Sequence, residues 1–153
     1  MVSFDVVSLY TMIPVDEALE VLKKITDLET VELIGICLKS SYFSFKEKSM
    51  SKHMALMGSP LSPLISNLYM EHFEHMALRS FPFTPEEWKR YVDDIFAKWS
   101  HGLDKLKEFL SHINSLSKYI KFTIEIEKDN QLPFLDVLLT KKNGKLSHQV
   151  FRK

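Results

Sequence analysis

The chain has 153 residues, of which 45% are hydrophobic, and this size and composition suit one folded domain and exclude a disordered polymer. Lys and Arg residues number 20, as do Asp and Glu residues, and a net charge of zero is unusual for a module that holds nucleic acid on its own. The single cysteine, Cys37, excludes an internal disulfide framework, suits a reducing compartment and is expected to be a small core residue.

The sequence contains no apolar run of about 18 residues, the length that a membrane-spanning helix needs. The N-terminus also lacks a basic segment followed by an apolar one, the pattern typical of a secretory leader. We therefore expect an intracellular protein, with the nucleus as one candidate compartment, and no membrane partner.

The first third of the chain predicts one strand followed by two helices. Val2–Leu9 is rich in β-branched residues and predicts a strand that closes before Pro14. From Val15 onward, apolar residues recur at helical spacing: Ala18, Leu19, Leu22 and Ile25. Thr30 is expected to cap a second helix that carries further apolar residues: Leu33, Ile34, Cys37 and Leu38.

The middle of the chain predicts a hairpin, a loop and a long helix. Tyr42–Phe45 alternates as a short strand, and a polar turn separates it from Met54–Met57. Gly and Pro content predicts a loop over residues 58–63. Pro63 is tolerated in the first turn of a helix, and Leu64–Leu78 keeps helical spacing.

The last part of the chain predicts mainly strands. Two apolar arms flank adjacent aspartates in WKRYVDDIFAKW, residues 88–99, and a helix is expected near Leu103–Leu116. Lys121–Glu127 alternates as a strand. Phe134–Thr140 and Lys145–Phe151 flank Asn143-Gly144, a strong two-residue hairpin signal. These elements predict one α+β unit.

Three aspartates carry the candidate chemistry. Asp5 lies within an apolar run, where a charge is costly unless it is paired or binds a metal. If the opening strand lies beside the 88–99 hairpin, Asp5, Asp93 and Asp94 converge into the all-oxygen site that Mg²⁺ prefers. Such a cluster is the protein half of two-metal phosphoryl transfer.

Structural alternatives exist for each of these acids. Asp-Asp is also an ordinary β-turn, because Asp forms local hydrogen bonds that favour turns. Asp5, taken alone, could be a buried charge that is paired with a structural partner.

Four sequence blocks resemble the ordered palm motifs of reverse transcriptases, and most closely those of Penelope-like retroelements. In chain order they are FDVVSLYTMIP, MGSPLSPLISNLYMEHFE, RYVDD and FTIEIEKDNQLPFLDVLLTKKNGKL. The resemblance implies a polymerase-type palm, with an antiparallel sheet backed by helices and a C-terminal hairpin. It also implies an RNA-directed DNA polymerase that transfers a nucleotidyl group from a dNTP to a primer 3′-hydroxyl on an RNA or DNA template.

The resemblance also implies roles for individual residues. Asp5 and Asp93, with Asp94 beside them, would bind catalytic Mg²⁺ or Mn²⁺. Tyr10 would stack under the sugar and exclude a 2′-hydroxyl, although a half-buried aromatic at a strand end is the structural alternative. The loop Gly58-Ser59-Pro60 would lie against the nucleotide, and a residue without Cβ allows such close backbone approach.

The sequence departs from the family pattern in several places. Met12 stands where an asparagine is usual, and KHMAL precedes Gly58 in place of a glycine-containing turn. The family's fingers and thumb are largely missing from these 153 residues, so we expect a palm fragment with little activity of its own. Its oligomeric state is not indicated.

Two alternative functions remain open from the sequence. A truncated or domesticated palm without catalysis could act as a nucleic-acid or protein interaction module. Residues 71–75, EHFEH, place Glu and His at helical spacing, which can bind transition metals, but a solvated helix face is the simpler interpretation.

Overall fold

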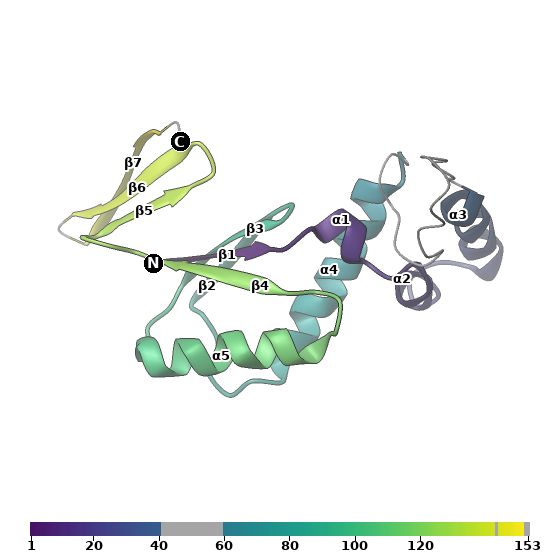
Figure 1. The fold of residues 1–153 in the computed structure, drawn as a ribbon, viewed down its shortest axis with the longest axis horizontal. Coiled ribbons are helices and arrows are strands. Elements are labelled where there is room, and N and C mark those ends of the chain that lie inside the picture. The colour runs from purple at the N-terminus through teal and green to yellow at the C-terminus, as the bar shows by residue number, and fades with distance from the viewer. Residues whose placement is uncertain (41–59, 143, 152–153) are drawn as a thin grey trace, which may run out of the picture. The chain divides into compact units, whose positions relative to one another are not determined.

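The structure, a computed structural model, describes residues 1–40, 60–142 and 144–151. The chain folds into two compact units (Figure 1). One unit combines Met1–Val7 with Ser80–Lys153, and the other consists of Ser8–Arg79. The opening strand thus belongs to a unit whose other residues follow the whole second unit in sequence. The assignment of all 153 residues to a single palm fragment stays a prediction.

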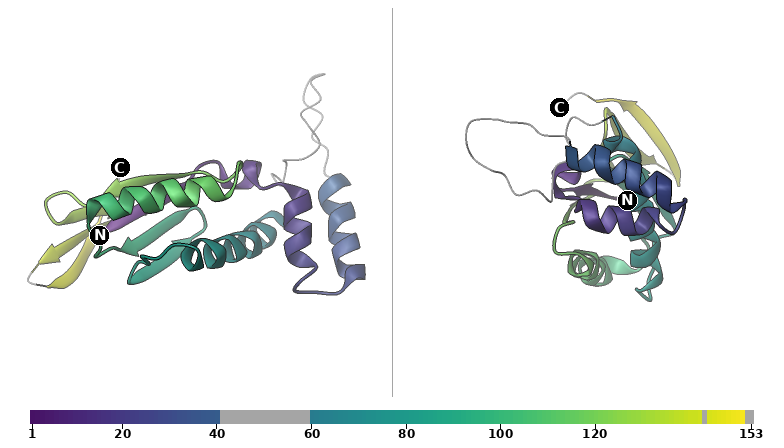
Figure 2. Two further views of the ribbon diagram at one scale, coloured as in Figure 1. Left: turned by 90° about the horizontal axis from the view of Figure 1, so that it is seen from below. Right: turned by 90° about the vertical axis from the view of Figure 1, so that its right-hand side faces the viewer.

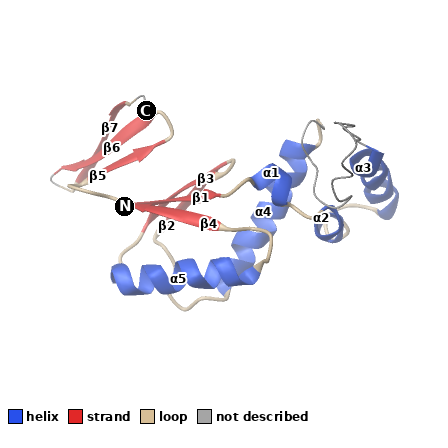
Figure 3. Cartoon of the chain, viewed as in Figure 1, coloured by secondary structure: helices blue, strands red, loops and turns tan. Residues whose placement is uncertain are grey.

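Strands and helices together confirm the α+β class. The described elements of the first unit are β1 (Val2–Val6), β2 (Glu87–Tyr91), β3 (Asp94–Lys98), α5 (Gly102–Leu116), β4 (Phe122–Ile126), β5 (Gln131–Phe134), β6 (Val137–Lys142) and β7 (Lys145–Val150). Those of the second unit are α1 (Leu9–Met12), α2 (Val15–Leu22), α3 (Leu28–Ser40) and α4 (Ser62–Arg79). Figure 3 colours helices and strands, and every strand that the structure describes belongs to the first unit.

The first unit is built on an antiparallel sheet with the strand order β2-β3-β1-β4. The expectation that the opening strand lies beside the 88–99 hairpin is confirmed, because β1 pairs with β3. Helix α5 runs along one face of this sheet (Figures 1 and 2). Since β1 alternates, Val2, Phe4 and Val6 are buried while Asp5 lies on the other face and is exposed.

Aromatic packing holds α5 against the sheet. Phe109 of α5 is fully buried, and its ring centroid lies 6.0 Å from that of Phe4 and 5.9 Å from that of Trp88. Leu106 and Ile113 are buried on the same helix, one turn before and one turn after Phe109. This core fixes the helix on one face of the sheet. On the other face, which carries Asp5, the ring of Phe96 on β3 lies 5.9 Å from that of Phe134 on β5.

The C-terminal hairpin is confirmed and belongs to a second sheet with the order β5-β6-β7. Gly144 has φ +73°, the left-handed conformation that a tight turn requires and that glycine adopts without strain. Strand β5 was not predicted. Leu135 has φ 52°, and this turn divides the predicted run Phe134–Thr140 into the end of β5 and the start of β6.

The predicted strand Val2–Leu9 is wrong beyond Val6. Ser8 has φ 53°, and its carbonyl accepts hydrogen bonds from the backbone N–H groups of Thr11 and Met12. A short helical turn, α1, therefore replaces the end of the strand, because local turn hydrogen bonds outweigh the β-propensity of these residues.

The two helices that follow are confirmed, with corrections to the second. Asp27, not Thr30, caps α3, because its Oδ1 accepts the backbone N–H of Thr30 at 2.8 Å. Cys37 and Leu33 are exposed rather than in the core. Leu38 of the predicted face is buried and Ile34 is half-buried, and Val31, seven residues before Leu38 and on the same face of the helix, is buried as well.

Helix α4 confirms the long helix after the loop, with Pro63 in its first turn. The hairpin predicted over Tyr42–Phe45 and Met54–Met57 lies outside the described residues. Within the described part of the chain, every helix is too short or too polar to cross a lipid bilayer.

Candidate active site

Asp5 projects from β1, one of the two inner strands of the four-stranded sheet, on the face that α5 does not cover. The sequence suggested a charge within an apolar strand, but β1 alternates between its two faces and Asp5 is exposed. No large desolvation cost therefore arises from its position. What makes the site unusual is the neighbour that Asp5 has across the sheet.

Asp94 lies directly opposite Asp5 on β3. The backbone N–H of Val6 donates to the carbonyl of Asp93 at 3.0 Å, so Val6 and Asp93 form a hydrogen-bonded pair. Such pairs alternate along an antiparallel ladder, and Asp5 and Asp94 therefore form the non-hydrogen-bonded pair, with Cα atoms about 4.5 Å apart and side chains close together. Like charges in this arrangement repel each other, and a bound cation would relieve the repulsion.

Asp93 occupies the tip of the β2–β3 hairpin. Tyr91 pairs with Asp94, so Val92 and Asp93 form the two-residue turn between the strands. Val92 has φ 57°, a left-handed conformation that is strained for a β-branched residue. The interpretation of Asp-Asp as a turn thus holds for the backbone of Asp93, while Asp94 begins strand β3.

The donor chemistry of this site fits Mg²⁺ or Mn²⁺. Carboxylate oxygens are hard ligands, and Mg²⁺ is commonly held by one or two carboxylates together with water and substrate phosphates. Asp5 and Asp94 supply such a pair. Among the described residues, no three acidic, histidine or cysteine side chains are grouped so that they could hold a metal ion.

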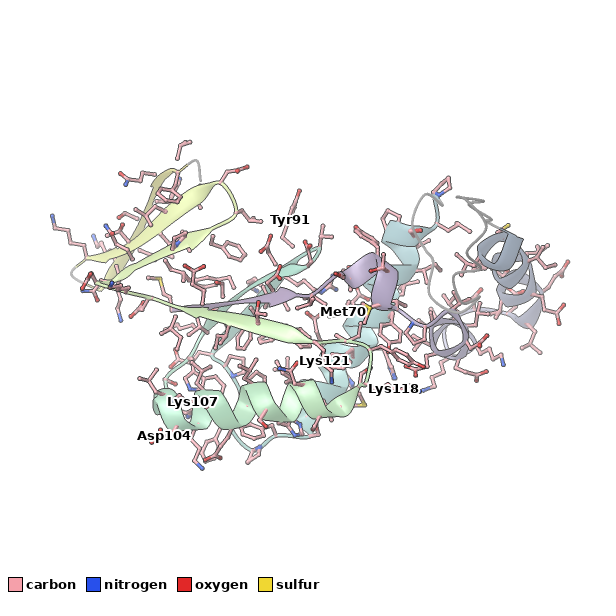
Figure 4. The ribbon with its side chains drawn as sticks, viewed as in Figure 1. Met70, Tyr91, Asp104, Lys107, Lys118 and Lys121 are labelled. Carbon is pink, nitrogen blue, oxygen red and sulfur yellow. The ribbon has the colours of Figure 1, made fainter. Side chains whose placement is uncertain are left out.

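Two further side chains complete a row across the sheet. Tyr91 lies beside Asp94 on β2, and Thr123 lies beside Asp5 on β4. Directly paired residues share a face of the sheet, so all four lie on the face opposite α5. Figure 4 shows Tyr91 on this side, and its side chain is 64% exposed.

Thr123 was not singled out from the sequence. The alternation of Lys121–Glu127 places it on the polar face of a strand, which is the only signal that the sequence offers. The strand with which β4 pairs cannot be deduced from that pattern, and the neighbour of Thr123 only becomes visible in the sheet register.

The residues expected to contact the nucleotide lie in the second unit. Tyr10 is half-buried within α1, so it is not at the end of a strand. Pro60 is exposed just before α4, while Gly58 and Ser59 lie outside the described residues. The roles of these four residues stay predictions.

The EHFEH segment lies on α4. Glu71, His72 and His75 are exposed, and Glu71 accepts a hydrogen bond from Asn67 Nδ2 at 2.8 Å on the same helix. The described side chains form no three-ligand metal group here. A solvated helix face accounts for these residues.

A model of the family described as reverse transcriptase (RNA-dependent DNA polymerase) matches residues 1–137. The match includes strands β1 to β5, and so contains Asp5, Asp93 and Asp94. The chain belongs to the reverse transcriptase family. A comparison with curated proteins found no match.

Proposed function

We propose that the chain is the palm of an RNA-directed DNA polymerase that joins a dNTP to a primer 3′-hydroxyl and releases pyrophosphate. The observation that carries the proposal is the pair of Asp5 and Asp94, directly opposite each other beside the Asp93 turn. Membership of the reverse transcriptase family supplies the reaction class.

Asp5 and Asp94 would hold a divalent cation on the face of the sheet opposite α5, and Asp93, in the adjoining turn, would be a further ligand by resemblance to the family. When bound, Mg²⁺ or Mn²⁺ lowers the pKa of an attacking hydroxyl and stabilises the charge on the leaving oxygen. The protein's own part is to keep two carboxylates side by side on rigid strands, so that the cation site is preorganised.

Further assignments follow from the sequence blocks. Tyr10 would exclude a 2′-hydroxyl, and Gly58-Ser59-Pro60 would lie against the incoming nucleotide. The resemblance of all four blocks to Penelope-like retroelements supports an origin in such an element. The partners would be an RNA or DNA template-primer and a dNTP.

Metal binding by the 153-residue chain tests the proposal. Millimolar Mg²⁺ or Mn²⁺ should raise the melting temperature, because a ligand that binds only the folded state stabilises it by mass action. Asp5→Asn should abolish this shift. Asp104→Asn is the matched control, since Asp104 lies on α5, on the other side of the sheet (Figure 4), and should leave the shift unchanged.

Wild-type melting that is indifferent to both cations would overturn the metal site and favour a non-catalytic interaction module. Templated primer extension provides the second readout. Any extension by a protein that carries these residues should be lost in Asp93→Asn, and extension that survives this substitution would contradict the catalytic assignment.

A further inference from the structure

Strand β7 forms an outer edge of the three-stranded sheet. Among the described strands it pairs with β6 alone (Figure 1). Every residue of β7 is exposed. Leu146 is 54% exposed, and Val150, at 79%, is the most exposed large apolar side chain that the structure describes. A strand edge of this kind is a template for pairing with another strand.

The hydrogen-bond phase of the β6–β7 ladder determines which backbone groups of β7 point outward. The N–H of Phe151 donates to the carbonyl of Asp136 at 2.8 Å, so these residues form a bonded pair. Bonded pairs alternate along an antiparallel ladder, and every second residue counted back from Phe151 therefore bonds to β6. The residues between them turn their N–H and C=O groups away from β6: Leu146, His148 and Val150. None of these groups bonds to another described residue.

The side chains of these outward-bonding residues share one face of the sheet, because successive side chains of a strand alternate between its faces. On β6, Val137 lies directly opposite Val150, and Leu139 lies directly opposite His148. Both β6 residues are half-buried. The apolar side chains of this face therefore continue outward from β6 and reach the edge of the sheet at Leu146 and Val150.

This edge is complementary to a second copy of itself. When His148 lies opposite His148 of an antiparallel copy, Leu146 of each copy lies opposite Val150 of the other. All of these residues have outward backbone groups, so each pair can exchange both of its N–H···O bonds. A two-fold axis perpendicular to the sheet also brings matching faces together. A shift of one residue would oppose outward groups with inward ones and lose these bonds.

Charge favours the same partner. The whole chain has a net charge of zero, so two copies do not repel each other over a distance. With histidine neutral, Lys145 is the one charged residue of β7. In the antiparallel pairing it lies opposite Phe151 of the other copy, which holds the two lysines at opposite ends of the paired strands. Like charges directly opposite each other, which would destabilise the pair, are thereby avoided.

We propose that β7 is a homodimerisation edge, at which two copies of the chain pair antiparallel about His148 and join their three-stranded sheets into one. Each copy uses its β7 once, so the two-fold pairing closes at a dimer. The inference is independent of the proposed metal site, because Asp5 and its neighbours lie on the other sheet. One short strand from each copy buries less than about 1,200 Å², the size of a weak, transient interface.

Sedimentation velocity of the 153-residue chain at pH 8 tests the proposal. The wild type should be monomeric at about 1 µM and shift to a dimer, without larger species, towards about 1 mM. Val150→Lys opposes a charge to Leu146 of the other copy and should weaken dimerisation at least about tenfold. Gln131→Lys is the matched control, because it adds the same charge at an exposed position of β5, the opposite edge of the same sheet, and should leave dimerisation unchanged.

His148→Pro tests the backbone part of the interface. The N–H of His148 points outward, so proline removes no bond between β6 and β7 and is tolerated on an edge strand, whereas the central pair of the dimer loses its donors. This variant should stay monomeric and should melt like the wild type at concentrations where the wild type is monomeric. If it does not fold, the double variant Leu146→Lys, Val150→Lys provides the same comparison.

A wild type that remains monomeric at every concentration would overturn the proposal. A dimer that persists in Val150→Lys and in His148→Pro or its replacement would place the contact elsewhere and overturn the role of β7. Species that grow beyond the dimer with concentration would show an open, aggregating edge in place of a closed two-fold pair, and would also overturn it.

Discussion

Val92 concentrates backbone strain at the tip of the acidic hairpin. Its φ of 57° is costly for a β-branched residue, at about 1–3 kcal/mol, whereas glycine adopts it freely. Glycine also loses more entropy on folding, by about 0.5–1 kcal/mol. Val92→Gly should therefore stabilise the protein, by about 1 kcal/mol, as measured by urea unfolding.

The control for this substitution is Val150→Gly in the exposed strand β7. The backbone of Val150 is ordinary extended strand, so Val150→Gly should destabilise the protein by about 0.5–1 kcal/mol. A loss of stability in Val92→Gly of the same size as in Val150→Gly would show that the hairpin tip is not strained.

At the residue scale, the sequence identified the acids but not their arrangement. Asp5, Asp93 and Asp94 stand out because carboxylates interrupt apolar runs. That Asp94 faces Asp5, and that Asp93 forms the turn, depends on the hydrogen-bond register between β1 and β3. The apolar alternation excludes a shift of one residue, but a shift of two would keep every side chain on its face and still give Asp5 another neighbour.

At the scale of elements, the N-terminus of α3 depends on a single carboxylate. The pKa of Asp27 is lowered from its usual 3.8, chiefly because the backbone N–H of Thr30 donates to it and secondly because the Thr30 hydroxyl does so. A lowered folded-state pKa means that this carboxylate stabilises the protein above about pH 3.8. The contribution is lost as the pH falls through the folded-state pKa.

Asp27→Asn should distinguish the effect of the carboxylate charge on stability from the effect of the capping hydrogen bond. Asparagine still accepts the N–H of Thr30 but does not titrate, so the variant should lose less stability than the wild type between pH 5 and pH 3. Asp27→Ala removes the cap and should be less stable than the wild type at neutral pH. Urea unfolding at several pH values measures both effects, and parallel curves for wild type and Asp27→Asn would contradict the role of the charge.

Elements with a strong period were predicted correctly, and elements set by local turns were not. Helix α5 and strand β4 follow their apolar patterns closely, because packing against the sheet determines both. Strand β5 and the turn at α1 depend on the left-handed backbone conformations of Leu135 and Ser8, which residues other than glycine seldom adopt. Sequence patterns cannot indicate them, because the surrounding structure imposes the backbone geometry there.

At the scale of the whole molecule, charge should govern nucleic-acid binding. The chain has zero net charge, so no overall attraction draws it to a phosphate backbone. We expect weak binding to a labelled template-primer through local lysine and arginine contacts, with affinity falling steeply between about 50 and 200 mM salt. Fluorescence anisotropy measures this dependence, and tight binding that is insensitive to salt would contradict it.

The discontinuity of the first unit has a consequence for synthesis. Strand β1 is made before the segment Ser8–Arg79, yet both of its partners, β3 and β4, are made after that segment. The second unit and the β2–β3 hairpin rely on nearby residues and can begin to fold earlier, whereas β1 must wait to be inserted between two later strands. Because Asp5 lies on β1, the pair with Asp94 can form only in this late, long-range step. A nascent chain therefore has no assembled acidic pair until β3 has been made.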